Sequence, residues 1–244
     1  MNGTWVAAAG ILACAAAMAG RPLMTNDAEP LERGRWQVEA AAGYVRADSH
    51  DHLDLPLTLT YGILPRVEAG VGFGGHFAEC EDHRGRTAYE ESVGDLTVGF
   101  KWKLLDQDEA CCDQAVSGTV KFPTADDDED MGSGKTDFDL TYILTLAVTD
   151  RISGLMNVGY TWLGGEGDVL HYGPAVTWQR NDRWQPVAEL VVETPVDRGR
   201  TSAGVNVGIR YQLKEGWTLD AAAMASVAGD WPDFAVTAGI TWVF

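Results

Sequence analysis

The chain has 244 residues, which is enough for one β-barrel or for one to two ordinary domains. A hydrophobic content of 45% and a mean hydropathy of −0.12 exclude a bundle of membrane-spanning helices. The net charge of −18 argues against nucleic acid and anionic lipid as partners, and it fits a solvated acidic surface.

Residues 1–19 contain no charged side chain and have the features of a secretory signal peptide. The apolar run from Trp5 to Met18 is too short to span a bilayer, and Ala17-Met18-Ala19 fits an A-x-A cleavage site. Lipoprotein processing at Cys14 is the alternative. The next stretch, residues 20–34, is polar and without period, and we expect it to be a periplasmic lead-in to the barrel.

From residue 35 to residue 244, segments with the two-residue period of β-strands recur, with turn signals between them. Each is long enough for a tilted transmembrane strand of about 9–11 residues. The pattern predicts an all-β, transmembrane, up-and-down antiparallel β-barrel of about twelve strands. The predicted strands are 35–48, 52–64, 66–79, 93–105, 114–125, 137–150, 151–164, 168–180, 183–196, 201–213, 216–228 and 233–244.

The connections alternate in length. Those after the even strands are mostly tight, whereas the two longest, residues 80–92 and 126–136, follow odd strands. Outer-membrane barrels have short periplasmic turns and longer outer loops, so both termini are expected in the periplasm. On this topology Cys80 lies outside the cell, and Cys111 and Cys112 lie in the periplasm.

The last strand, DFAVTAGITWVF, places a wholly apolar set of residues on one face and ends on Phe244. That face is expected to contact lipid, with aromatic residues at the membrane interface. A closing strand with a terminal aromatic residue resembles the assembly signal of outer-membrane barrels, and Phe244 is the candidate. The outward-facing residues of the fourth strand are predicted to include Trp102 and Leu104.

The same alternation turns the charged residues of the strands toward the lumen, because ionised groups facing lipid cost about 2–4 kcal/mol at the midplane. The predicted lumen-lining residues are Glu39, Glu68, Asp95, Lys101, Lys103, Lys121, Asp137, Asp139, Glu189, Glu193, Arg210 and Asp220. We expect them to form a polar network with an excess of carboxylates, which would disfavour anionic solutes.

Three stretches resemble a known family. RPLMTNDAEPLERGRWQVEAAAGY is similar to the opening of the outer-membrane proteins named for the meta-pathway of phenol degradation. VKFPTADDDEDMGSGKTDFDL resembles the central segment of that family, although Ala125 stands where a Gly is usual, and ILPRVEAGVGFG resembles a third stretch. The resemblance covers the whole chain after the signal peptide. It implies a transporter of aromatic or other hydrophobic compounds and transfers no catalytic residue.

Several motifs match part of a metal-binding or catalytic pattern, but none matches a whole one. The acidic loop has carboxylates at the spacing of a calcium-binding loop, from Asp126 to Asp130, but Met131 occupies the position where that loop needs Gly. His50 and His52 lack a visible third metal ligand. No Gly-x-Ser-x-Gly motif is present, and no spacing ties a histidine to a serine. We therefore predict no catalytic residue, cofactor or metal site.

The sequence favours a passive channel or transporter for small, possibly aromatic or hydrophobic, molecules. A structural or interaction barrel with a plugged lumen is the main alternative, and an outer-membrane lipid hydrolase is a weaker one. The expected partners are outer-membrane lipid and lipopolysaccharide, the barrel-assembly machinery and a small solute, and no nucleic acid.

Overall fold

The computed structural model describes residues 20–244, apart from residues 48–49, 82–86, 126–133, 166 and 198. The predicted signal peptide and the acidic Asp126–Asp130 loop lie outside the described residues. Within the described part of the chain, no helix is long and apolar enough to cross a membrane.

Thirteen strands form in the described residues. Twelve of them follow the predicted segments, whereas β4 lies almost wholly in the stretch that was predicted as the connection at residues 80–92. Their bounds are β1 (Trp36–Ala47), β2 (His50–Leu64), β3 (Val67–Glu81), β4 (Thr87–Val93), β5 (Leu96–Leu105), β6 (Asp113–Phe122), β7 (Asp137–Thr149), β8 (Ile152–Trp162), β9 (Val169–Trp178), β10 (Trp184–Pro195), β11 (Ser202–Lys214), β12 (Trp217–Ala228) and β13 (Phe234–Val243).

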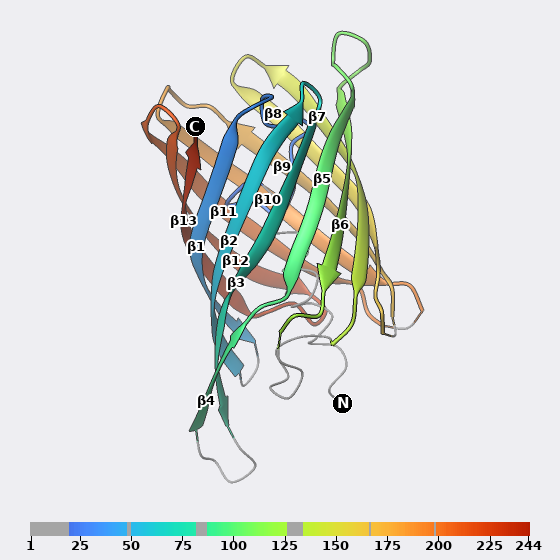
Figure 1. Cartoon of the computed structure of the whole chain (residues 1–244), viewed down its shortest axis with the longest axis vertical. Coiled ribbons are helices and arrows are strands. Elements are labelled where there is room, and N and C mark those ends of the chain that lie inside the picture. The colour runs from blue at the N-terminus through green and yellow to red at the C-terminus, as the bar shows by residue number, and fades with distance from the viewer. Residues whose placement is uncertain (1–19, 48–49, 82–86, 126–133, 166, 198) are drawn as a thin grey trace.

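All strand pairs are antiparallel, and the sheet closes on itself because β1 pairs with both β13 and β2. β3 pairs with β5 over Val67–Gly72 and with β4 over Gly75–Glu81, so β4 and β5 share one position in the wall. The barrel therefore has twelve strand positions, which confirms the predicted fold class. In Figure 1, β3 and β4 extend together past the lower end of the barrel.

The outer face is apolar, as the alternation predicted. Large exposed side chains on it include Leu53, Phe100, Leu140 and Val236. Leu104 is an exception: a register shift between Lys103 and Leu105 makes Leu105 the exposed residue. A β-bulge adds one residue to a strand and so reverses the face of those that follow.

Aromatic side chains gather near the chain-terminal end of the barrel. The ring centroids of Trp217 and Trp242 are 5.0 Å apart, and those of Trp242 and Phe244 are 4.1 Å apart. Trp162 and Phe138 are exposed near the opposite end. Aromatic residues at two levels around an apolar belt are typical of membrane-spanning barrels.

The stretch before β1, residues 20–34, runs inside the barrel. Leu23 packs with Leu155 and Val187, and Ala28 packs with Ala115 and Ile143, so the only buried apolar clusters in the described residues join this stretch to the inner wall. The sequence predicted a lead-in to the barrel here without predicting these contacts. Leu23 and Ala28 are the buried apolar residues of this mostly polar stretch, and packing on the wall removes them from water.

Candidate functional site in the barrel lumen

The twelve predicted lumen-lining residues all have side chains withdrawn from bulk solvent. Nine of them are buried, and Asp95, Asp139 and Arg210 are half-buried. The nine buried residues are Glu39, Glu68, Lys101, Lys103, Lys121, Asp137, Glu189, Glu193 and Asp220.

Three of these, Lys101, Lys103 and Lys121, come from β5 and β6, and we call them the lysine arc. Lys121 is 1% exposed, and its Nζ lies 2.7 Å from Asp137 and 3.2 Å from Asp95. A buried ammonium is tolerated only when carboxylates neutralise it and satisfy its hydrogen bonds. The lysine arc is therefore a paired network rather than a free positive surface.

The other two lysines of the arc contact residues 20–34, which we call the N-terminal segment. Lys101 Nζ lies 3.2 Å from Glu68 and donates a hydrogen bond of 3.3 Å to the carbonyl of Asp27. Lys103 Nζ forms an ion pair with Glu29. The lysine arc thus holds residues 27–29 against one side of the lumen.

On the opposite side, β10 and β11 hold the beginning of the segment by its backbone. The carboxylate of Glu189 accepts hydrogen bonds of 2.8 Å from the amides of both Met24 and Thr25. The Arg210 guanidinium donates bonds of 2.6 Å to the carbonyls of Gly20 and Arg21. Because this backbone belongs to no strand, its buried polar groups need such partners.

Further contacts complete the attachment of the segment. Asn206 donates to the carbonyl of Pro22 over 3.1 Å, and the Arg21 guanidinium lies 3.0 Å from Asp220. The amide of Leu31 donates to Glu68. The roles of Arg21, Asn206 and the segment were not predicted from the sequence. The signal that pointed to further partners was the excess of carboxylates over cations among the predicted lumenal residues, eight against four.

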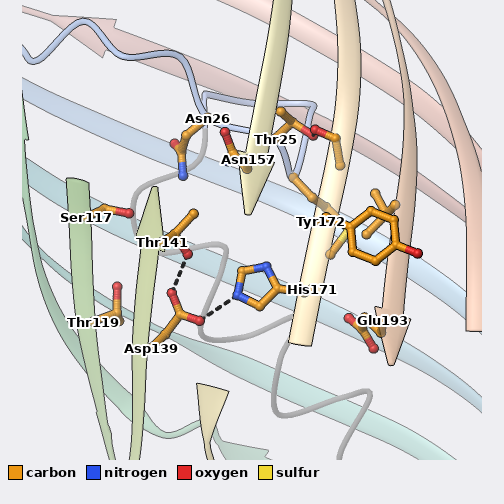
Figure 2. Close-up of a pocket in the computed structure, with 13 residues that line it drawn as sticks. Thr25, Asn26, Ser117, Thr119, Asp139, Thr141, Asn157, His171, Tyr172 and Glu193 are labelled. Atoms are coloured by element: carbon orange, nitrogen blue, oxygen red, sulfur yellow. Dashed lines mark hydrogen bonds and ion pairs between the residues drawn. The ribbon is translucent and has the colours of Figure 1, made fainter. Parts of the chain in front are cut away.

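A cavity of about 40 Å³ lies between the segment and the strands β6 to β10. His171 spans it, and its Nε2 is 2.7 Å from Oδ2 of Asp139 (Figure 2). The hydroxyls of Thr141 and Thr161 donate to the same carboxylate over 2.7 and 2.8 Å. Both oxygens of Asp139 therefore have hydrogen-bond partners.

Gly159 makes the His171–Asp139 contact possible. It lies on β8, between the two strands that carry these residues, and it pairs directly with His171 and with Thr141. A Cβ at Gly159 would lie 2.4 Å from the His171 ring and from the Thr141 hydroxyl. The imidazole crosses β8 only because no side chain stands there.

Glu193 is different from the other carboxylates of the lumen. It is 6% exposed, and its Oε1 is buried with no hydrogen-bond partner. It pairs across the sheet with His171 and also lines the cavity. By contrast, Glu39 accepts bonds from Thr58 and Thr241, over 3.2 and 3.4 Å.

Two other predicted features lie at the chain-terminal end of the barrel. The amide and carbonyl of Phe244 each form a 2.9 Å bond with Trp36, which continues the pairing of the last strand with the first. Cys111 and Cys112 lie in the turn between β5 and β6, with their sulfurs 3.5 Å apart. Burial raises the pKa of the Cys112 thiol.

Metal binding has no geometric support in the described part of the chain. Nowhere in it are three or more His, Cys, Asp or Glu side chains arranged to hold a metal ion.

The sequence matches, over residues 19–244, the family described as "Putative MetA-pathway of phenol degradation", and the chain belongs to that family. The resemblance noted in the sequence is thereby confirmed. None of the curated proteins matches the chain.

Solved structures show the same fold at low sequence identity. The COG4313 outer membrane channel from Pseudomonas putida F1 is 14% identical, with a TM-score of 0.70, and the match covers 89% of this chain and 98% of that one. The NanC porin is 10% identical, with a TM-score of 0.62 and coverage of 84% and 98%. The KdgM porin is 10% identical, with a TM-score of 0.61 and coverage of 85% and 99%.

Proposed function

We propose that the protein is a passive channel of the bacterial outer membrane through which small solutes cross the barrel lumen beside residues 20–34. The observation that carries the proposal is a closed barrel with an apolar outer face and a polar, charge-lined interior that retains a cavity. The outer face suits lipid, and the inner face suits water and polar solutes. The shared fold with outer-membrane channels supports this function.

The lumenal charge favours neutral and cationic solutes. Eight of the twelve lumen-lining candidates are carboxylates and four are cations. The segment adds three charged side chains that form ion pairs with the wall: one cation, Arg21, and two carboxylates, Asp27 and Glu29. An excess of negative charge in a narrow pore raises the local concentration of cations and excludes anions.

Conductance is the direct test of the channel. The refolded protein in planar bilayers should show ion-conducting steps, and a salt gradient should give a reversal potential of the sign expected for cations. A variant lacking residues 20–33 should conduct more, because the segment narrows the lumen. If the wild type shows no conductance and the shortened variant conducts, the segment plugs the lumen, and the structural or interaction barrel is the better description. If both are silent, the channel is wrong.

Solute size and chemistry can be tested in liposomes. The family description points to phenolic compounds, and a phenol can exchange hydrogen bonds with a polar lumen. Uptake of phenol and of a small neutral sugar should both exceed the uptake by protein-free liposomes. Uptake of the sugar alone would exclude an aromatic solute while leaving the channel intact.

A hydrolase is not favoured by the site. Among the described residues, the hydrogen-bond partner of His171 is a carboxylate, and no serine hydroxyl bonds to this ring. A nucleophile needs its base within hydrogen-bond reach.

For the same channel we propose outer-membrane lipid and lipopolysaccharide as the surroundings, periplasmic termini, and insertion by the barrel-assembly machinery. Phe244 would serve as the insertion signal, since it ends the strand that pairs with β1 and closes the barrel. Deleting Phe244 should lower the membrane-inserted yield several-fold. Deleting Arg200, which is exposed between β10 and β11, is the control, and equal yields would contradict the role of Phe244.

A further inference from the structure

We propose that the lumenal cavity is a binding subsite for the primary ammonium group of a small organic solute, with Glu193 as its principal acceptor. This inference rests on the proposed channel function and identifies a class of solute for it. The cavity lies between β6 to β10 and residues 24–26 of the segment, so a solute crossing the lumen beside the segment would meet it (Figure 2).

Glu193 supplies the unsatisfied group. Its side chain is 6% exposed, and its buried Oε1 has no donor in the described structure. A buried carboxylate oxygen without a donor costs the free energy of its lost hydration, so it is normally paired. The other carboxylate of the cavity, Asp139, is already held by His171, Thr141 and Thr161. Glu193 is therefore the carboxylate that remains for a solute, and the buried Oδ1 of Asn26, which also lines the cavity without a donor, is a neutral second acceptor.

The remaining lining matches an N–H donor rather than an anion. No lysine or arginine lines the cavity, whereas the hydroxyls of Ser117, Thr119 and Thr141 do. Hydroxyl oxygens can accept the additional hydrogens of an ammonium group, which has three donors. A metal ion is disfavoured because the described residues hold no suitable group of three His, Cys, Asp or Glu ligands.

Size and apolar surface limit the solute. The cavity volume is about 40 Å³, and one water needs about 10–15 Å³ on this measure, so roughly three heavy atoms fit. Met24 and Val191 also line it and can cover a short hydrocarbon chain. Ethylammonium has this size and combines an ammonium head with an apolar tail. Tetramethylammonium has the same charge but no N–H donor, and it is larger.

The test uses the full-length refolded protein in planar bilayers with potassium chloride as the carrier salt. Ethylammonium should reduce the potassium current in a saturable manner, and tetramethylammonium at the same concentration should not. Glu193→Gln should weaken the block at least about tenfold, because it removes a charge-assisted hydrogen bond. Glu39→Gln removes the same charge from β1, on another part of the wall, and should leave the block unchanged.

These outcomes separate the inference from the channel itself. Equal block by both cations, or equal weakening in both variants, would show a general effect of lumenal charge and would overturn the subsite. If the wild type does not conduct, the channel function fails and binding is judged separately from the unfolding temperature in detergent. Ethylammonium should then raise that temperature above its value in tetramethylammonium, because ligands that bind only the folded state stabilise it. An identical temperature in both salts would refute the subsite.

Discussion

Two regions of the inner wall hold the same N-terminal segment through different sets of groups. The lysine arc on β5 and β6 contacts it through ammonium groups, which meet Glu29 and the carbonyl of Asp27. The region on β10 and β11 contacts it through Glu189, which accepts from backbone amides, and Arg210, which donates to backbone carbonyls. In the lysine arc every lysine is ion-paired, whereas β10 also carries Glu193, which has a buried oxygen without a partner.

The comparison shows that buried charge in this lumen has two different uses. Where carboxylates and lysines alternate on neighbouring strands, the charges neutralise each other and fix the wall. Where a carboxylate faces a stretch of free backbone, it replaces the partners that a strand would have supplied. Glu39 and Asp139 are held instead by threonine hydroxyls and, for Asp139, by His171. Among the described lumenal carboxylates, Glu193 alone has a buried oxygen without a hydrogen-bond partner, and this singles it out for a solute.

The largest expected effect comes from breaking the lysine arc. Lys121→Met should lower the free energy of unfolding by about 3–5 kcal/mol, because Asp95 and Asp137 are left without their shared cation. The measurement is urea unfolding of the barrel in lipid vesicles. Lys214→Met, at the end of β11 beside Trp217, is the control and should cost about 1 kcal/mol or less. Comparable losses of unfolding free energy in the two variants would show that the ion pairs of Lys121 do not stabilise the barrel more than an exposed lysine does.

The second effect concerns the opposite region. Glu189→Ala should cost about 3 kcal/mol, because the amides of Met24 and Thr25 and the Asn206 side chain lose their acceptor. The released segment should also give larger and noisier current steps. Glu39→Ala removes a lumenal carboxylate that bonds to threonine hydroxyls rather than to the segment. It should not add noise to the current steps, and the same noise in both variants would contradict the attachment.

In both regions the sequence predicted which side chains face the lumen but not their contacts with the N-terminal segment. Period two alone selects inward positions such as Lys101 and Glu189, because lipid on one face leaves charged side chains only the other face. The two-residue period cannot predict which groups of the N-terminal segment these side chains contact, since that segment has no period. The bulge that exchanges Leu104 for Leu105 has no sequence signal either. Contacts of residues 20–34 depend on where the closed wall places distant strands, and local pattern does not contain that information.

A smaller effect tests the geometry beside Glu193. Gly159→Ala places a Cβ 2.4 Å from His171 and should displace the ring from Asp139, at a cost of about 1–3 kcal/mol. Gly154→Ala on the same strand is the matched control, because its Cβ would meet only Val148, at 3.9 Å. Urea unfolding of both variants and the histidine ring signals in NMR spectra are the measurements. An unmoved His171 ring would show that β8 can shift to accommodate the methyl group.

The smallest effect lies at the periplasm-facing turn after β5, on the proposed topology, where the lysine arc meets solvent. The hydrogen bond from Lys103, whose Nζ is 2.8 Å from Asp106, holds the pKa of that carboxyl below its ordinary value. A carboxyl with a lowered pKa contributes stability above its unfolded pKa of about 4, and this stability is lost as the pH falls through the lower folded pKa. Lys103→Met should therefore raise the pKa of Asp106, as followed by the chemical shift of its carboxyl carbon. Because the side chains of Asp106 and Glu29, two partners of Lys103, are 37% and 67% exposed, the change in unfolding free energy should be small. A large change would mean that the ion pair with Glu29 contributes more to holding the segment than exposed pairs usually do.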